Sequence, residues 1–124
     1  MIVDESDARF VLGESNIPGA GRGLFASGPL AAGDRLLVVG VLIRAQSVSD
    51  QTTAFADQHK FRVGDYLLIP LGYGGMVNHS SSIPNLEKVI EGETLYLQAT
   101  RAVRVGEELL FCYSEYAQER FQLR

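Results

Sequence analysis

Two glycines separated by one residue stand between a loop-forming segment and an apolar one. Gly21-Arg22-Gly23 follows a stretch rich in Gly, Ser, Asn and Pro, and it precedes Leu24-Phe25. Glycine lets the backbone turn sharply and approach a ligand, and it leaves N–H groups available to bind a carboxylate or a phosphate. An ordinary turn has the same composition. The pattern is not a dinucleotide-binding fingerprint, because a third glycine and a following helix are missing.

A second polar cluster, Asn78-His79-Ser80, follows an apolar, glycine-rich segment, and Pro84-Asn85 comes shortly after it. Side-chain amides in such a place can hydrogen-bond to the backbone or to a ligand. His79 alone is more often a structural residue with satisfied hydrogen bonds than a metal ligand or a general base. The cluster therefore indicates either a structural role or a binding role.

Tyr113 ends an apolar segment that begins after Gly106-Glu107-Glu108. Its ring can simply cap a hydrophobic core, with the hydroxyl group in water. In a catalytic role the phenol could orient an amine or help to remove its proton, provided that its surroundings shift its pKa from about 10 toward the working pH. An aromatic pocket would attract a cationic or methylated ammonium group. Four further tyrosines could build one: Tyr66, Tyr73, Tyr96 and Tyr116.

Other common catalytic arrangements are poorly represented. Ser80-Ser81-Ser82 lies beside His79, but no Gly-x-Ser-x-Gly motif exists. Adjacent residues on a strand or turn point apart, so we expect Glu107 and Glu108 to form a solvated turn rather than a carboxylate pair. With Cys112 as the only cysteine and two histidines, a four-ligand zinc site would need several carboxylates, and we expect no metal.

Short strands separated by glycine turns are predicted to position these residues. Alternating strand–helix units are missing, which disfavours a Rossmann-type fold. The only helix is expected around residues 53–59, because residues 71–76 contain too many glycines for a regular helix. The expected strands are residues 9–12, one or two strands within 35–43, 61–63 and 66–70 around a Gly64-Asp65 turn, 94–100, and 109–113.

The composition predicts one globular domain over residues 1–124. Hydrophobic residues make up 46% of the chain and charged residues 21%, a balance without a bias to disorder. The net charge is -4 and the 11 basic residues are spread along the chain, so we expect no nucleic-acid-binding surface. The N-terminus lacks the features of a signal peptide, and no apolar run is long enough to span a membrane. The expected location is therefore cytoplasmic.

Taken together and in this order, these segments resemble the SET domain of protein lysine methyltransferases. Residues 21–26 resemble the first signature of the family, and residues 30–34 resemble the turn that follows it. Asn78-His79-Ser80, with Asn85 downstream, matches the NHS signature. Residues 106–113 resemble the third signature, which ends in the catalytic tyrosine of the family. The resemblance covers about residues 9–116, and the small viral and bacterial members also share residues 65–67 and 71–74.

This resemblance implies a mostly β, β-clip-like SET fold, with several small curved antiparallel sheets, a C-terminal pseudoknot and little helix. It implies transfer of a methyl group from S-adenosyl-L-methionine to the ε-amine of a lysine in a protein or peptide, with Tyr113 as the catalytic residue. A homodimer is possible, since small members can pair. The residues implied in cofactor binding are Ala20, Gly21, Arg22, Gly23, Asn78, His79, Tyr113 and Phe121. Those implied on the substrate side are Tyr66, Leu67, Tyr73 and Tyr116.

The chain departs from the pattern of the family at several positions. Met76-Val77 replaces the Arg-Phe pair that usually precedes the asparagine, and Ser81 replaces the cysteine after the NHS signature. Cys112 stands where an acidic residue often precedes the catalytic tyrosine, and Arg22 where some small members carry an aromatic residue that touches the substrate. No cysteine-rich segment follows, so no zinc-bound lid is expected. These differences bear on the substrate and on the number of methyl groups transferred more than on cofactor binding.

Two other functions fit the same residues. A SET fold could recognise a peptide or a partner protein without turnover, because a fold does not guarantee activity. Such a module could still bind S-adenosylmethionine, but it would transfer no methyl group. A hydrolase built on the serines beside His79 is the third alternative, and it predicts no affinity for S-adenosylmethionine.

Overall fold

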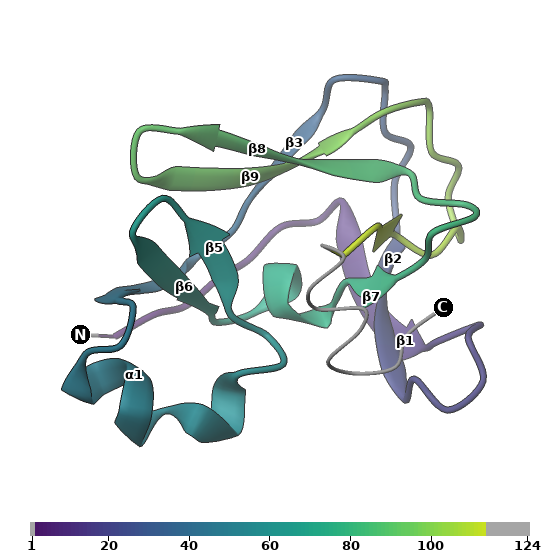
Figure 1. The fold of residues 1–124 in the computed structure, drawn as a ribbon. Helices are drawn as coiled ribbons and strands as arrows, with labels where there is room; N and C mark the ends of the chain where they lie inside the picture. The colour runs from purple at the N-terminus through teal and green to yellow at the C-terminus, as the bar shows by residue number, and fades with distance from the viewer. Residues whose placement is uncertain (1, 114–124) are drawn as a thin grey trace.

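The computed structural model describes residues 2–113, which form three small sheets and three short helical segments (Figure 1). Strands account for much more of the chain than helices do, and most neighbouring strands are antiparallel. The prediction of a mostly β fold with little helix is confirmed. None of the helices in this part of the chain is long and apolar enough to cross a membrane.

The first sheet is a hairpin of β1 (Phe10–Glu14) and β2 (Arg22–Ala26), which pair along their full length. Residues 15–21 form the loop between them. A backbone hydrogen bond of 2.8 Å from the Ser15 N–H to the Gly21 carbonyl closes the base of this loop. The glycine segment predicted from the sequence therefore projects from the end of a regular hairpin.

The second sheet has five strands, and its last strand in sequence lies inside it. β10 pairs in parallel with both β7 and β8, whereas β3, β9 and β8 are antiparallel neighbours. β10 therefore lies between two strands that precede it in the sequence. The C-terminal pseudoknot implied by the resemblance concerns a segment that extends outside the described residues. The strand order is β3 (Arg35–Leu37), β9 (Thr94–Ala99), β8 (Leu86–Glu91), β10 (Leu110–Phe111) and β7 (Asn78–His79).

The third sheet contains the hairpin predicted around Gly64-Asp65. The turn needs a glycine, because Gly64 has a φ of 59°. The strand order is β4 (Gly40–Arg44), β6 (Tyr66–Pro70) and β5 (Phe61–Val63). The 3₁₀ segment η2 (Tyr73–Met76) follows β6 and leads directly into β7, which agrees with the expectation that residues 71–76 do not form a regular helix.

The helix predicted around residues 53–59 is only partly present. The chain instead forms α1 (Val48–Thr52) and the 3₁₀ segment η1 (Ala54–Ala56). The helix starts earlier because the Ser47 hydroxyl accepts a hydrogen bond from the backbone N–H of Asp50, a normal N-cap contact. The buried Lys60 ammonium then holds the segment folded by pairing with Asp50 and Asp57, at 2.7 and 2.6 Å.

Strand β8 was not predicted, and its burial pattern explains why. Leu86 is its only fully buried residue, and four of its six residues are exposed. Its partner β9 alternates between buried and half-buried residues along its whole length. The two strands form a hairpin around Gly92, whose φ is 63°. β8 therefore adopts a strand conformation because it pairs with β9, and its own hydrophobic pattern does not predict a strand.

The hydrophobic core joins the β1–β2 hairpin to the five-stranded sheet. Leu24 of β2, Leu97 of β9 and Leu109 have no exposed surface, and they belong to one cluster of buried side chains. The Leu109 N–H also donates to the Leu24 carbonyl at 2.8 Å. This packing fixes the position of the glycine loop relative to β7 and β10.

Candidate functional site

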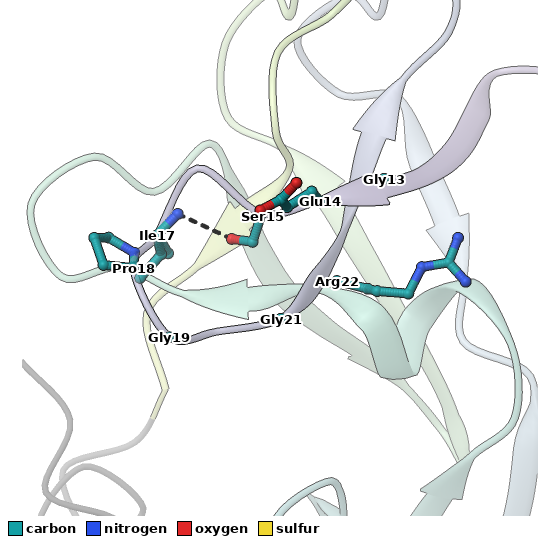
Figure 2. Close-up of a pocket in the computed structure, with 8 residues that line it drawn as sticks. All are labelled: Gly13, Glu14, Ser15, Ile17, Pro18, Gly19, Gly21 and Arg22. Carbon is teal, nitrogen blue, oxygen red and sulfur yellow. Dashed lines mark hydrogen bonds between the residues drawn. The ribbon is translucent and has the colours of Figure 1, made fainter.

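The loop between β1 and β2 encloses a hollow of about 560 Å³. Gly19 and Gly21 have φ values of 79° and 75°, in the region that favours glycine, so the tight path of the loop depends on them. Figure 2 shows Ile17 and Pro18 at the tip of the loop and the Arg22 side chain at its opposite end. The lining residues are Gly13, Glu14, Ser15, Ile17, Pro18, Gly19, Gly21 and Arg22. The predicted residues Gly21 and Arg22 therefore line a hollow, as a ligand-binding loop requires.

Asn78 joins this loop to the five-stranded sheet. It lies on β7, and its side-chain Nδ2 donates a hydrogen bond of 3.0 Å to the Arg22 carbonyl. The approach is close because Gly23 has no side chain: a Cβ there would stand 3.0 Å from Asn78 Nδ2. The structure thus brings together the glycine segment and the NHS segment that were predicted separately.

Tyr113 is held against the same strand by two hydrogen bonds. Its backbone N–H donates to His79 Nδ1 at 3.0 Å, and its hydroxyl group donates to the Val77 carbonyl at 3.0 Å. The His79 and Tyr113 rings meet edge to face with centroids 5.0 Å apart. His79 is buried, and because its Nδ1 accepts a hydrogen bond, the neutral ring carries its proton on Nε2. His79 therefore positions Tyr113.

The environment of Tyr113 does not lower the pKa of its phenol. Burial raises this pKa above its ordinary value of 10.0, because the charged phenolate would lose solvation. A proton-removing role would need a lower pKa, so the observed shift of the Tyr113 pKa is in the wrong direction for that role. At neutral pH the phenol is protonated and acts as a hydrogen-bond donor.

Glu108 is the residue of this site whose environment was predicted wrongly from the sequence. It was expected in a solvated turn, but only 5% of its surface is exposed. Its carboxylate accepts hydrogen bonds from the Ser15 hydroxyl at 2.7 Å, the Asn16 N–H at 2.8 Å and Asn78 Nδ2 at 3.1 Å. The chain near Glu108 is bridged to β2 at Phe25. This bridge turns the Glu108 side chain inward, while its neighbour Glu107 points outward.

Glu107 keeps the surface role that was expected of both residues. Its carboxylate accepts from the Arg104 N–H at 3.0 Å and pairs with Arg101 at 3.0 Å, with about a third of the side chain exposed (31%). The hydrogen bond from Arg104, opposed by some desolvation and aided by Arg101, lowers the pKa of the Glu107 carboxyl group. The two adjacent carboxylates thus occupy opposite environments. Residues 108–111 are all buried, so no alternation along the chain marks Glu108 as the inward one.

Asn85 is a structural residue rather than part of an open site. It is 1% exposed. Its Nδ2 donates to the Glu108 carbonyl at 2.9 Å, and its Oδ1 accepts from the Leu110 N–H at 2.9 Å. Its side chain therefore satisfies two buried backbone groups next to β10, and it fixes the segment that carries Glu108 and Tyr113.

The described residues among those predicted on the substrate side lie on β6 and in η2, not on the glycine loop, β7 or β10. Tyr66 and Leu67 are half-buried on β6, and Arg44 lies over the Tyr66 ring at 5.2 Å. Tyr73, in η2, packs its ring against Phe10 with centroids 5.9 Å apart. Ala20, predicted on the cofactor side, is half-buried in the loop. The predicted substrate residue Tyr116 and the predicted cofactor residue Phe121 lie outside the described residues.

Comparison with known proteins identifies the fold. The SET domain family matches residues 21–114 of the chain. No curated protein sequence gave a match. Among solved structures, a humanised mutant of Chaetomium thermophilum Polycomb Repressive Complex 2, bound to an inhibitor, is similar with a TM-score of 0.74 and 21% identity. The similarity covers 89% of this chain but 15% of that one.

Two further structures extend this comparison. The same Chaetomium complex in an autoinhibited conformation, bound to S-adenosylmethionine, has a TM-score of 0.74 and 18% identity over 94% of this chain and 17% of that one. A Plasmodium falciparum protein named as a histone methyltransferase has a TM-score of 0.66 and 21% identity, over 89% of this chain and 96% of that one. The SET fold of the Chaetomium complex was thus solved with S-adenosylmethionine bound, the cofactor that the resemblance implies. The chain belongs to the SET domain family.

Proposed function

We propose that the chain is a methyltransferase that uses S-adenosylmethionine to methylate the ε-amine of a lysine in a protein or peptide. One observation carries the proposal: hydrogen bonds join the glycine loop to β7 through Asn78 and join β7 to Tyr113 through His79 and Val77. A fold alone would not support an activity. Here hydrogen bonds link the loop that lines the hollow to the polar strand β7 and to the half-buried phenol of Tyr113, while the lining of the hollow itself comes from residues 13–22.

The residues present fit S-adenosylmethionine. The hollow of about 560 Å³ lies in the size range of small-molecule sites. In the proposed site, the backbone of residues 20–23 and the Asn78 side chain hold the amino-acid end of the cofactor. His79 holds the adenine part through its main chain, and Phe121 covers that part. Asn78 is only half-buried, so its amide can reach a ligand.

The bound cofactor supplies a methyl group on a sulfonium: the amine lone pair forms the C–N bond while the C–S bond breaks and the sulfur keeps the bonding electrons. The amine must be neutral, so its extra proton goes to solvent before transfer. Burial of an ammonium group lowers its pKa and assists this loss. Tyr113 acts by orientation, because its phenol is protonated and fixed by Val77. Precise alignment of the amine and the methyl group accounts for much of the rate in such a displacement.

The proposed substrate is a lysine within a protein or peptide, and Tyr66, Leu67, Tyr73 and Tyr116 are proposed to line its side of the site. Tyr66 and Tyr73 are half-buried, and the Tyr66 ring already has the Arg44 guanidinium over it, an interaction of the kind that an ammonium group would make with an aromatic ring. The Chaetomium complex has also been solved in complex with H3 that is methylated or mutated at a lysine position. That property of a similar structure supports a lysine-containing protein or peptide as the substrate class for this chain.

Transfer of an isotopically labelled methyl group to protein tests this function. The chain is incubated with labelled S-adenosylmethionine and a mixture of lysine-rich proteins, and the product is analysed by mass spectrometry. We expect label on lysine side chains. The matched control is the same protein mixture after chemical blocking of its lysines, which should accept no label.

The outcome also separates the alternative functions. Binding of S-adenosylmethionine without any labelled product would contradict the proposal and would favour a peptide-binding module. Label that persists after the lysines are blocked would place the methyl group on another acceptor and would contradict the lysine assignment.

A further inference from the structure

The orientation of the Asn78 side-chain amide is fixed by two acceptors. Its Nδ2 donates to the Arg22 carbonyl at 3.0 Å and to Glu108 Oε2 at 3.1 Å. Neither oxygen can donate a hydrogen bond in return. An amide turned through 180° would place Oδ1 against both oxygens and would lose both hydrogen bonds. The NH₂ group of Asn78 therefore faces inward.

The other end of this amide remains available for a ligand. Asn78 Oδ1 accepts no hydrogen bond from any residue in the described part of the chain, and it is not among the buried polar atoms that lack a partner. The oxygen is thus accessible to solvent at the junction between the glycine loop and β7. Oδ1 is a hydrogen-bond acceptor, so a ligand's ammonium group can donate a hydrogen bond to it. A ligand's carboxylate would be repelled there.

Glu108 carries a buried negative charge at the same place. Three neutral donors hold its carboxylate, and no lysine or arginine side chain within residues 2–113 forms an ion pair with it. A Cβ at Gly23 would collide with Glu108 Oε2, so the carboxylate fills the space against β2. A buried charge without a counter-ion is costly. A cation bound near Asn78 would reduce that cost.

We infer that Glu108 is a positioning residue that, together with the Arg22 carbonyl, sets the polarity of Asn78, so that Asn78 Oδ1 accepts a hydrogen bond from the α-ammonium group of the cofactor. This inference rests on the proposed function, because it concerns how the same cofactor is held. It assigns a role to the inward carboxylate of the pair at 107–108. It also explains why a negative charge is retained in a buried position next to the loop.

The substitution Glu108→Gln tests the polarity argument directly. The Asn16 N–H must still face an oxygen, so the introduced NH₂ group takes the place of Oε2. The Asn78 amide then meets one acceptor, the Arg22 carbonyl, and one donor, the introduced NH₂ group, so neither orientation satisfies both. The Ser15 hydroxyl can rotate from donor to acceptor. The variant keeps the shape of the site and removes one of the two acceptors that fix the polarity of Asn78.

Calorimetric titrations with two ligands measure the effect. S-adenosylhomocysteine has the α-ammonium group, whereas 5′-methylthioadenosine keeps the adenosine and the sulfur but lacks the amino-acid end. We expect Glu108→Gln to weaken S-adenosylhomocysteine binding by up to about tenfold, the lower end of the value of a hydrogen bond to a charged group, because the Arg22 carbonyl still favours the original orientation of Asn78. Binding of 5′-methylthioadenosine should change by less than about twofold. The control Glu107→Gln, on the neighbouring surface carboxylate, should change neither affinity.

Two further measurements separate a polarity effect from damage to the fold. The double variant Glu108→Gln with Asn78→Asp again presents an oxygen to the ligand, and it should recover part of the lost affinity. In the unmodified protein, NMR should show the Asn78 side-chain amide protons protected from exchange with solvent, which requires no variant to fold.

The inference is overturned if Glu108→Gln weakens both ligands equally or neither, if the double variant recovers nothing, or if the Asn78 amide protons exchange freely. Failure of the unmodified chain to bind S-adenosylhomocysteine at all would instead refute the proposed function, and this inference with it.

Discussion

The hydroxyl group of Tyr113 illustrates how burial determines what a side chain can do. The phenol donates a hydrogen bond to the Val77 carbonyl, and desolvation raises its pKa above 10.0. A group with a raised pKa stays protonated at every pH below its ordinary value. Its neutral form therefore contributes to stability below about pH 10 and loses that contribution only as the pH rises further. At neutral pH the Tyr113 hydroxyl is accordingly protonated and donates a hydrogen bond to Val77.

Replacement of this hydroxyl should lower turnover and leave the pH profile unchanged. We expect Tyr113→Phe to reduce kcat by about tenfold or more, since one hydrogen bond that aligns the amine is lost. Cofactor affinity measured by calorimetry should stay nearly the same. Turnover of both proteins should rise with pH as the lysine amine, with an ordinary pKa of about 10.4, becomes neutral. The unmodified protein and Tyr113→Phe should keep the same ratio of turnover rates between about pH 7 and 9. A marked change in this ratio would show that Tyr113 itself gains or loses a proton in that range.

At the scale of elements, the site depends on the close approach of β2 to β7. Gly23 lies on β2 where Glu108 and Asn78 fill the space next to the backbone. Because a protein interior is closely packed, even one methyl group at this point must displace a neighbour. Both neighbours hold the loop, so a steric change at Gly23 should reach the ligand-binding hollow.

A pair of glycine substitutions tests this packing. Gly23→Ala should lower the free energy of unfolding by about 1–3 kcal/mol, as overpacking usually does, and it should also weaken binding of S-adenosylhomocysteine. Gly28→Ala is the matched control, because nothing lies within 4 Å of a Cβ at that position and its φ is not positive. It should leave affinity unchanged and stability unchanged or higher by less than about 1 kcal/mol. Chemical denaturation and calorimetry measure both quantities, and equal effects of the two substitutions would contradict the packing argument.

The sequence predicted those elements whose own residues show a turn motif, a hydrophobic alternation or a glycine-rich composition. The Gly64-Asp65 hairpin, the alternating strand β9 and the glycine loop were all expected at or near their observed positions. Strand β8 was missed because its exposed face carries little hydrophobic pattern. The start of α1 depends on one cap residue, Ser47, which the composition of the segment did not reveal.

Candidate site residues were named only where a motif indicated them. Asn78, His79 and Tyr113 were predicted because their order resembles a family, and the structure places them close together. The role of Glu108 could not be identified, because its contact with Ser15 joins residues 93 positions apart. Such a contact follows from strand order and from the missing side chain of Gly23, neither of which is visible in local sequence.

On the scale of the whole molecule, the insertion of β10 between β7 and β8 brings the three segments of the site together. Leu110 pairs with Asn78 and Phe111 with His79, and Asn85 fixes β10 from the other side. The proposed cofactor site therefore exists only in the folded chain. The proposed function depends on binding of S-adenosylmethionine at this site.

Calorimetric titration of the folded chain with S-adenosylmethionine measures this binding. We expect saturable binding of one cofactor per chain, with affinity reduced by about tenfold or more in Asn78→Ala, since a hydrogen bond to a charged group is lost. The absence of saturable binding up to millimolar cofactor, or full affinity in Asn78→Ala, would contradict the proposed cofactor site.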